Sequence, residues 1–237
     1  MNNAFDSSTS EADAIAYAID AHGVAWLTLD RPGSKVNILS TGVMKRLDEL
    51  ITQVHTDAAS NRVRSVVIRS GKAATFIAGA DVNEIGAITD PAEGGSKARS
   101  GQQVFVRLNQ LNVPVVVAID GMCLGGGTEL ALACSYRIAS DRRETRIGLP
   151  EVLLGIIPGF GGTTRLPRLV GMRAALDIIL TGRPVDAKKA ERIGLVDERV
   201  HPAILERRAA EVARALQGNG PSASAIRGTK RTAACRK

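Results

Sequence analysis

Residues 113–131, VPVVVAIDGMCLGGGTELA, decide the fold. The run from Val113 to Ile119 is almost entirely apolar and rich in β-branched residues, as is typical of a strand buried on both faces of a parallel sheet. A glycine-rich turn at residues 121–127 follows directly, and Thr128–Cys134 is predicted to be helical. The sequence therefore predicts a buried strand, a turn whose backbone can be approached closely, and then a helix.

The flanking sequence predicts further strands and helices in alternation. Residues 14–30 alternate apolar and polar positions around a glycine turn, which predicts a two-stranded hairpin. Ser40 is placed to cap a helix with apolar residues at helical spacing. Further strands are expected at 63–69, 136–139 and 146–149, and further helices at 102–111 and around Thr163, Ala174, Ala187 and Leu205.

This order predicts an α/β fold in which right-handed crossovers build a largely parallel sheet with helices outside it. No internal repeat and no Pro/Ser-rich linker divides the chain, so one domain is expected over residues 1–216. Residues 217–237 lose apolar periodicity and are predicted to be a basic, flexible tail.

Composition excludes several classes of protein. The 237 residues are 44% hydrophobic and 23% charged, which is typical of a globular chain and not of a disordered one. No stretch approaches the ~18 apolar residues of a membrane helix, and the N-terminus is acidic where a signal peptide is basic and apolar. We therefore expect a cytoplasmic protein without a membrane span.

The net charge of +7 does not indicate a nucleic-acid partner. Residues 201–237 carry eight Lys or Arg and two acids, so this segment holds +6 of the excess. Aromatic residues are only 3% of the chain, too few to stack bases. The three cysteines, Cys123, Cys134 and Cys235, have no metal-ligand spacing, so we expect reduced thiols and no metal site.

Three glycine-rich segments, at 76–81, 121–129 and 155–163, compete as ligand sites. None is a nucleotide signature, because the second lacks the lysine of a P-loop and no GxGxxG follows a strand. The second instead offers the unpaired amides of a helix start, which suit an oxygen that becomes negative. Glu129 lies in the first turn of that helix, where it either takes part in chemistry or merely complements the helix dipole.

A second acid strengthens the chemical interpretation. Glu151 follows Leu149-Pro150 in an otherwise apolar segment, where a carboxylate needs a partner or a function. Two carboxylates beside backbone donors supply a general acid, a general base and a site for an enolate. Addition of water to an α,β-unsaturated thioester requires that set of groups.

Several motifs together resemble the crotonase, or enoyl-CoA hydratase/isomerase, superfamily. They are AGAD at 78–81, GGGTELA at 125–131, PE at 150–151, GIIPGFGGTTRL at 155–166, LTG at 180–182 and AKKAERIGLV at 187–196. RPGSKVNILS at 31–40 is most similar to the N-terminal hydratase region of multifunctional fatty-acid oxidation alpha subunits. The resemblance, which covers residues 14–205, implies a ClpP-like crotonase fold of repeated ββα units in a spiral.

The resemblance also implies roles for particular residues. The Ala80 and Gly126 amides would bind the thioester oxygen, and the backbone of Ala78, Gly79 and Asp81 would border the bound coenzyme A. Glu129 and Glu151 would be the catalytic pair that holds water and moves protons. Asp81 has an alternative function as the cap of the next helix. Coenzyme A would enter as part of the substrate, with no separate cofactor and no metal.

Other expectations remain open at this point. The same residues permit enoyl-CoA isomerisation, although two carboxylates favour the hydratase. The C-terminal helical part is shorter than in the family, which implies a truncated chain that is either an active hydratase in β-oxidation or a catalytically weak remnant. Family members form trimers or hexamers or belong to a fatty-acid oxidation complex, so a homo-oligomer or such a complex is expected.

Overall fold

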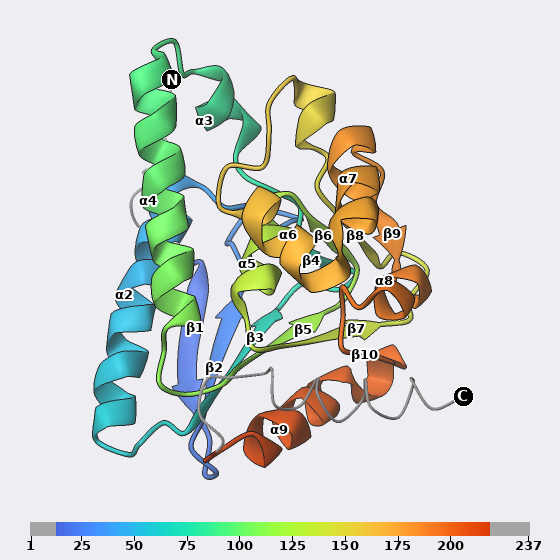
Figure 1. The fold of residues 1–237 in the computed structure, drawn as a ribbon. Coiled ribbons are helices and arrows are strands. Elements are labelled where there is room, and N and C mark those ends of the chain that lie inside the picture. Colours follow the sequence, from blue (N-terminus) through green and yellow to red (C-terminus); the bar gives the residue numbers. More distant parts are fainter. Residues whose placement is uncertain (1–12, 219–237) are drawn as a thin grey trace.

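The computed structural model describes residues 13–218, and its strands form two sheets (Figure 1). The larger sheet has the strand order β1 (Ile15–Ile19), β2 (Val24–Leu29), β3 (Ser65–Ser70), β5 (Val115–Ile119), β7 (Tyr136–Ser140) and β10 (Glu198–Val200). The smaller sheet has the order β4 (Thr75–Ile77), β6 (Met122–Leu124), β8 (Arg146–Gly148) and β9 (Val185–Asp186). Only β1–β2 and β8–β9 are antiparallel, which confirms a largely parallel architecture and the N-terminal hairpin.

Strand and helix order repeats along the chain. A strand of the larger sheet, a strand of the smaller sheet and then helix follow one another at β3-β4, β5-β6 and β7-β8, as expected for ββα units. The α-helices are α2 (Thr41–Ala59), α3 (Val82–Gly86), α4 (Pro91–Asn109), α5 (Gly126–Ala133), α6 (Gly162–Val170), α7 (Met172–Thr181), α8 (Ala187–Ile193) and α9 (Leu205–Ala215). Two 3₁₀ helices are η1 (Glu151–Leu154) and η2 (Pro202–Ile204).

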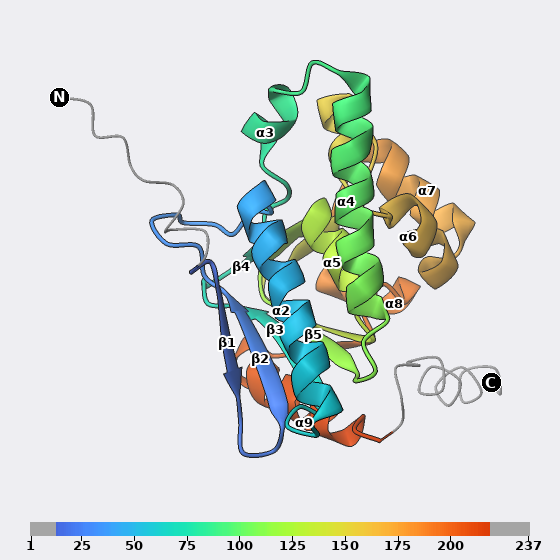
Figure 2. The same cartoon turned by 90° about the vertical axis from the view of Figure 1, so that its left-hand side faces the viewer.

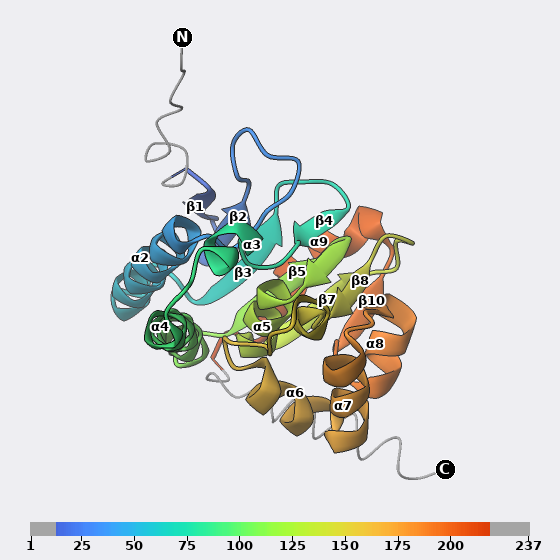
Figure 3. The ribbon, with the colours of Figure 1, turned by 90° about the horizontal axis from the view of Figure 1, so that it is seen from above.

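Both faces of the larger sheet are buried because its strands alternate their side chains between two apolar clusters. On β3, Val66 and Ile68 pack with α2 and α4, whereas Val67 packs with α9. The α2 and α4 helices lie side by side on one face (Figure 2). Helix α9 lies on the opposite side, below the strands in Figure 1 and therefore largely hidden behind them in Figure 3. All five residues of β5 are buried, as the sequence predicted.

Helix α2 begins as predicted, because the Ser40 side chain accepts a hydrogen bond from the amide of Val43. The helix expected at 102–111 starts earlier than predicted, since α4 already begins at Pro91. The Asp90 side chain caps α4 by accepting from the Ala92 amide, and proline suits the first helical position. Two glycines in the first turns of α4 interrupt the apolar periodicity, so the sequence did not predict that part of the helix.

Of the four strands in the smaller sheet, the sequence predicted β8 correctly and missed the other three. Each of β4, β6 and β9 has only two or three residues, too few for a periodic pattern, and β6 lies inside the predicted glycine turn. Helix α5 begins at Gly126, two residues earlier than predicted. The predicted basic tail falls outside the described residues from position 219 onward. Among the described helices, none is both long and apolar enough to cross a membrane.

Candidate active site

Three of the predicted site segments follow the carboxyl ends of three neighbouring parallel strands. Residues 78–81 follow β4, residues 125–129 follow β6, and Pro150-Glu151 follows β8. In the smaller sheet β6 pairs with β4 on one side and with β8 on the other, both in parallel. Because such strands end at the same edge of a sheet, segments more than 70 residues apart along the chain meet there.

Gly125 is the point where the three segments touch. Its φ of +52° favours glycine. A Cβ at this position would lie 3.0 Å from Glu151 Oε1 and 3.6 Å from the Cα of Gly79. Gly127 lets α5 pack on β4, since a Cβ there would lie 2.7 Å from the Cβ of Ile77. The glycine triplet thus brings both other segments against the start of α5.

Glu129 is held by a loop that is remote from its own helix. Its side chain is buried, and Oε1 accepts hydrogen bonds from the amides of Phe160 at 2.8 Å and Gly162 at 2.7 Å. Burial raises the pKa of Glu129 to about 7; the Gly162 amide opposes this rise and the charge of Glu151 adds to it. Complementing the α5 dipole therefore does not account for this carboxylate.

Arg165 fixes the loop that holds Glu129. Its Nη1 donates to the carbonyl of Phe160 at 3.0 Å, and its charge lowers the pKa of Glu129. The Phe160 ring also packs edge-on against Phe105, with ring centroids 5.7 Å apart. Sequence reasoning did not assign these residues, although the GFGG run at 159–162 was a visible signal.

Glu151 lies at the start of η1 and not in a strand. It is 8% exposed, and its Oε2 is a buried atom with no hydrogen-bond partner among the described residues. Burial raises its pKa, which a hydrogen bond from its own backbone only partly opposes. The site therefore contains one carboxylate held by amides and a second that is buried without a donor to Oε2.

The amides of Ala80 and Gly126 are directed away from acceptors in their own segments, and their binding of a thioester oxygen stays a prediction. Both neighbours of Ala80 pair with Leu39, whose amide donates to the Gly79 carbonyl and whose carbonyl accepts from Asp81. The N–H of Ala80 therefore points away from this segment. Gly126 lies in the first turn of α5, where amides have no acceptor within the helix.

Other predicted residues have structural contacts of their own. The Asp81 side chain caps α3 by accepting from the amides of Asn83 and Glu84, as the alternative interpretation expected. The Ala78 amide donates to the carbonyl of Asn37. Contact of Ala78, Gly79 and Asp81 with coenzyme A stays a prediction. Within residues 13–218, no group of three or more His, Cys, Asp or Glu side chains is arranged to hold a metal ion.

Comparison with known proteins decides the family. The profile of the family described as enoyl-CoA hydratase/isomerase matches residues 20–233. The chain belongs to this enoyl-CoA hydratase/isomerase family. Its crotonase fold is confirmed by an enoyl-CoA hydratase from Bacillus anthracis, which is 36% identical with a TM-score of 0.79 over 88% of this chain and 78% of that one. A hydratase from Mycobacterium smegmatis is 27% identical, with a TM-score of 0.78 over 86% and 76% of the two chains.

Longer relatives of this hydratase/isomerase chain are also similar to it. The fatty acid oxidation complex subunit alpha of Vibrio campbellii is 46% identical over 196 residues, which cover 83% of this chain and 27% of that protein. The subunit alpha of Aliivibrio fischeri is 45% identical over 200 residues, or 84% and 29%. The chain thus spans little more than a quarter of the length of these curated relatives.

Proposed function

We propose that this chain is an enoyl-CoA hydratase that adds water across the 2-trans double bond of an enoyl-CoA thioester to give the 3-hydroxyacyl-CoA. One observation supports this function most directly: two buried carboxylates, Glu129 and Glu151, lie at the start of α5, where the amides of the first helical turn have no acceptor within the helix. Hydration needs a base for the water and an acid for the α carbon, and both are at hand.

The surroundings of the two carboxylates suggest which of them acts as the base and which as the acid. Two amides and Arg165 favour the ionised form of Glu129, which suits a base that removes a proton from water. No donor among the described residues stabilises an ionised Oε2 of Glu151, which suits a proton donor. The water oxygen bonds to the β carbon, and Glu151 gives its proton to the α carbon. A proton passing from Glu129 to Glu151 then restores both groups.

The Ala80 and Gly126 amides form the proposed site for the thioester oxygen. As the β carbon is attacked, negative charge moves onto that oxygen, where preorganised N–H donors stabilise it. Coenzyme A is held as part of the substrate, beside residues 78–81, and the reaction needs no separate cofactor or metal.

The relatives suggest a setting for this reaction. Similarity to fatty acid oxidation alpha subunits supports a role in fatty-acid β-oxidation. Large apolar side chains are exposed on η1, on the segment after it and on α7, namely Leu153, Leu154, Ile157, Met172 and Leu180. These exposed side chains support a homo-oligomer, as a trimer or hexamer, or assembly within a fatty-acid oxidation complex. Cytoplasmic location and the absence of nucleic-acid partners stay predictions.

Loss of enoyl absorbance with crotonyl-CoA tests the function. We expect turnover that falls at least about a hundredfold in Glu129→Gln and in Glu151→Gln, since each removes one proton-transfer group. A folded wild-type protein that binds crotonyl-CoA without turnover contradicts the proposal and indicates a catalytically weak remnant.

Isomerisation is the second candidate, because one glutamate suffices to move a proton between the α and γ carbons. A 3-enoyl-CoA substrate measures it by gain of enoyl absorbance. Gain of absorbance without any hydration of crotonyl-CoA would favour the isomerase.

A further inference from the structure

The segment that precedes α2 touches both halves of the proposed thioester-oxygen site. Leu39 pairs through its backbone with Gly79 and Asp81, on either side of Ala80. A Cβ added to Gly126 would lie 3.0 Å from Leu39 Cδ1, so the Leu39 side chain packs directly against the second half. A shift of this segment would therefore move Ala80 through its backbone pairing and would change the packing against Gly126.

Asn37 anchors this segment to the ends of three strands. It is 2% exposed, and its Nδ2 lies 3.0 Å from the carbonyl oxygen of Leu29, 2.9 Å from Ser70 Oγ and 3.1 Å from the carbonyl oxygen of Phe76. Leu29 and Ser70 are the last residues of β2 and β3, and Phe76 lies next to the last residue of β4. One side chain thus connects both sheets.

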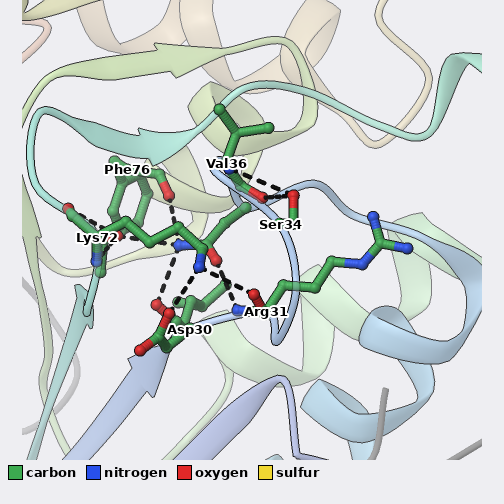
Figure 4. Close-up of polar contacts among 9 residues, drawn as sticks. Asp30, Arg31, Ser34, Val36, Lys72 and Phe76 are labelled. Carbon is green, nitrogen blue, oxygen red and sulfur yellow. Dashed lines mark hydrogen bonds and ion pairs between the residues drawn. The ribbon is translucent and has the colours of Figure 1, made fainter. Parts of the chain in front are cut away.

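The side-chain oxygen and the backbone carbonyl of Asn37 also accept hydrogen bonds. Its Oδ1 accepts from the amide of Arg31 at 3.0 Å, and its backbone carbonyl accepts from the amide of Ala78 at 2.8 Å. Figure 4 shows the surrounding contacts, where Ser34 bonds within its own loop to Val36 and the Lys72 side chain reaches Asp30.

The chemistry of this position selects asparagine. Three acceptor oxygens surround Nδ2, and one backbone amide donates to Oδ1. The position therefore requires a short side chain that has N–H donors on one side and an acceptor oxygen on the other, as the amide group of asparagine has. Aspartate has the same shape but would place an oxygen against three oxygens. The loss of a fully satisfied buried network is costly and displaces the chain around it.

We propose that Asn37 is a positioning residue for the thioester-oxygen site: by joining β2, β3 and β4 to the segment at 37–39, it sets the direction of the Ala80 N–H relative to that of Gly126. This role rests on the proposed hydratase function. Asn37 does not touch the reacting atoms, so its loss should affect the polarisation of the bound thioester more than the binding of coenzyme A.

The test compares Asn37→Asp and Asn37→Ser with wild type, using Ser34→Ala as the matched control. Ser34 belongs to the same loop, and its replacement by alanine also removes hydrogen bonds, but within the described residues those bonds go to Val36 and not to residues 78–81. For both Asn37 variants we expect kcat with crotonyl-CoA to fall about tenfold to a hundredfold while KM changes less than about threefold. Ser34→Ala should keep wild-type kcat.

A spectroscopic measurement separates positioning from a loss of folded protein. Dimethylaminocinnamoyl-CoA absorbs at longer wavelength as donors polarise its thioester carbonyl, and the shift per bound molecule does not depend on the folded fraction. We expect a clear red shift on wild type and Ser34→Ala and a smaller one on the Asn37 variants. If Asn37→Asp does not fold, Asn37→Ser, which keeps one hydroxyl donor, gives the same comparison.

The outcomes are distinct. A full red shift and wild-type kcat in a folded Asn37 variant overturn the positioning role and leave the hydratase function intact. No red shift and no turnover on wild type overturn the hydratase function, and the positioning role with it.

Discussion

Replacing Glu129 by glutamine should stabilise the protein above neutral pH while removing its activity. Glutamine has nearly the same shape, and its side-chain oxygen can still accept from the amides of Phe160 and Gly162. The change removes only the charge that burial makes unfavourable. A catalytic group kept at a cost in stability is a common feature of active sites.

The size of the effect follows from the pKa of Glu129, which burial raises from 4.5 to about 7. Below pH 4.5 this carboxyl is protonated in both the folded and the unfolded state, and it makes no difference to stability. As the pH rises, the unfolded chain loses this proton first, so the free energy of unfolding falls until the folded state also ionises near pH 7. One pKa unit corresponds to about 1.4 kcal/mol, so the full loss is about 3 kcal/mol.

Urea unfolding followed by the fluorescence of Trp26, the one tryptophan of the chain, measures this at pH 4.5, 6 and 8. The free energy of unfolding of Glu129→Gln should exceed that of wild type by about 3 kcal/mol more at pH 8 than at pH 4.5. Glu144 is exposed, so Glu144→Gln is the matched control and should follow wild type at every pH. A difference between Glu129→Gln and wild type that stays constant with pH would refute the reasoning.

Three further changes test other parts of the site and its support. Arg165→Met removes the donor to the Phe160 carbonyl and a cation near Glu129, so the pKa read from the pH profile of kcat/KM should rise; an unchanged profile speaks against this electrostatic role. Gly127→Ala forces α5 away from β4 and should lower both activity and thermal stability, whereas a wild-type melting temperature would contradict this packing. Arg137→Met removes a buried guanidinium that donates to Asp197 Oδ2 at 2.6 Å and to the Cys134 carbonyl at 2.7 Å, and should cost about 1.5–3 kcal/mol in urea unfolding; a loss below about 0.5 kcal/mol would show that these contacts contribute little.

The sequence was sufficient to predict the secondary-structure elements whose apolar residues follow a regular period. The alternation of residues 14–30 and the apolar run at 115–119 predicted three strands correctly, because each buries its side chains in a pattern set by strand geometry alone. The cap at Ser40 likewise depends only on local contacts. The strands β4, β6 and β9 escaped notice since two or three residues form a strand only when neighbours supply the pairing.

The same distinction explains what sequence could show of the site. The residue types made Glu129 and Glu151 candidate site residues, because a carboxylate in an apolar segment is costly to bury and is retained where it has a partner or a function. The two carboxylates come together because β6 pairs in parallel with β8, with Leu124 opposite Gly148. The separation of 22 residues between Glu129 and Glu151 in the sequence does not encode that register.

The loop whose amides bind the Glu129 carboxylate was the least predictable part of the site. The amides of Phe160 and Gly162 act through the backbone, so side-chain type does not mark them as partners of a carboxylate. Position 162 nevertheless favours glycine, since a Cβ there would lie 3.0 Å from both Cγ and Oε1 of Glu129 and would press against that side chain. Gly162 thus allows the close approach of its amide to the Glu129 carboxylate. A backbone donor cannot be removed by changing one side chain, which makes this contact robust to substitution at Phe160 but sensitive to substitution at Gly162.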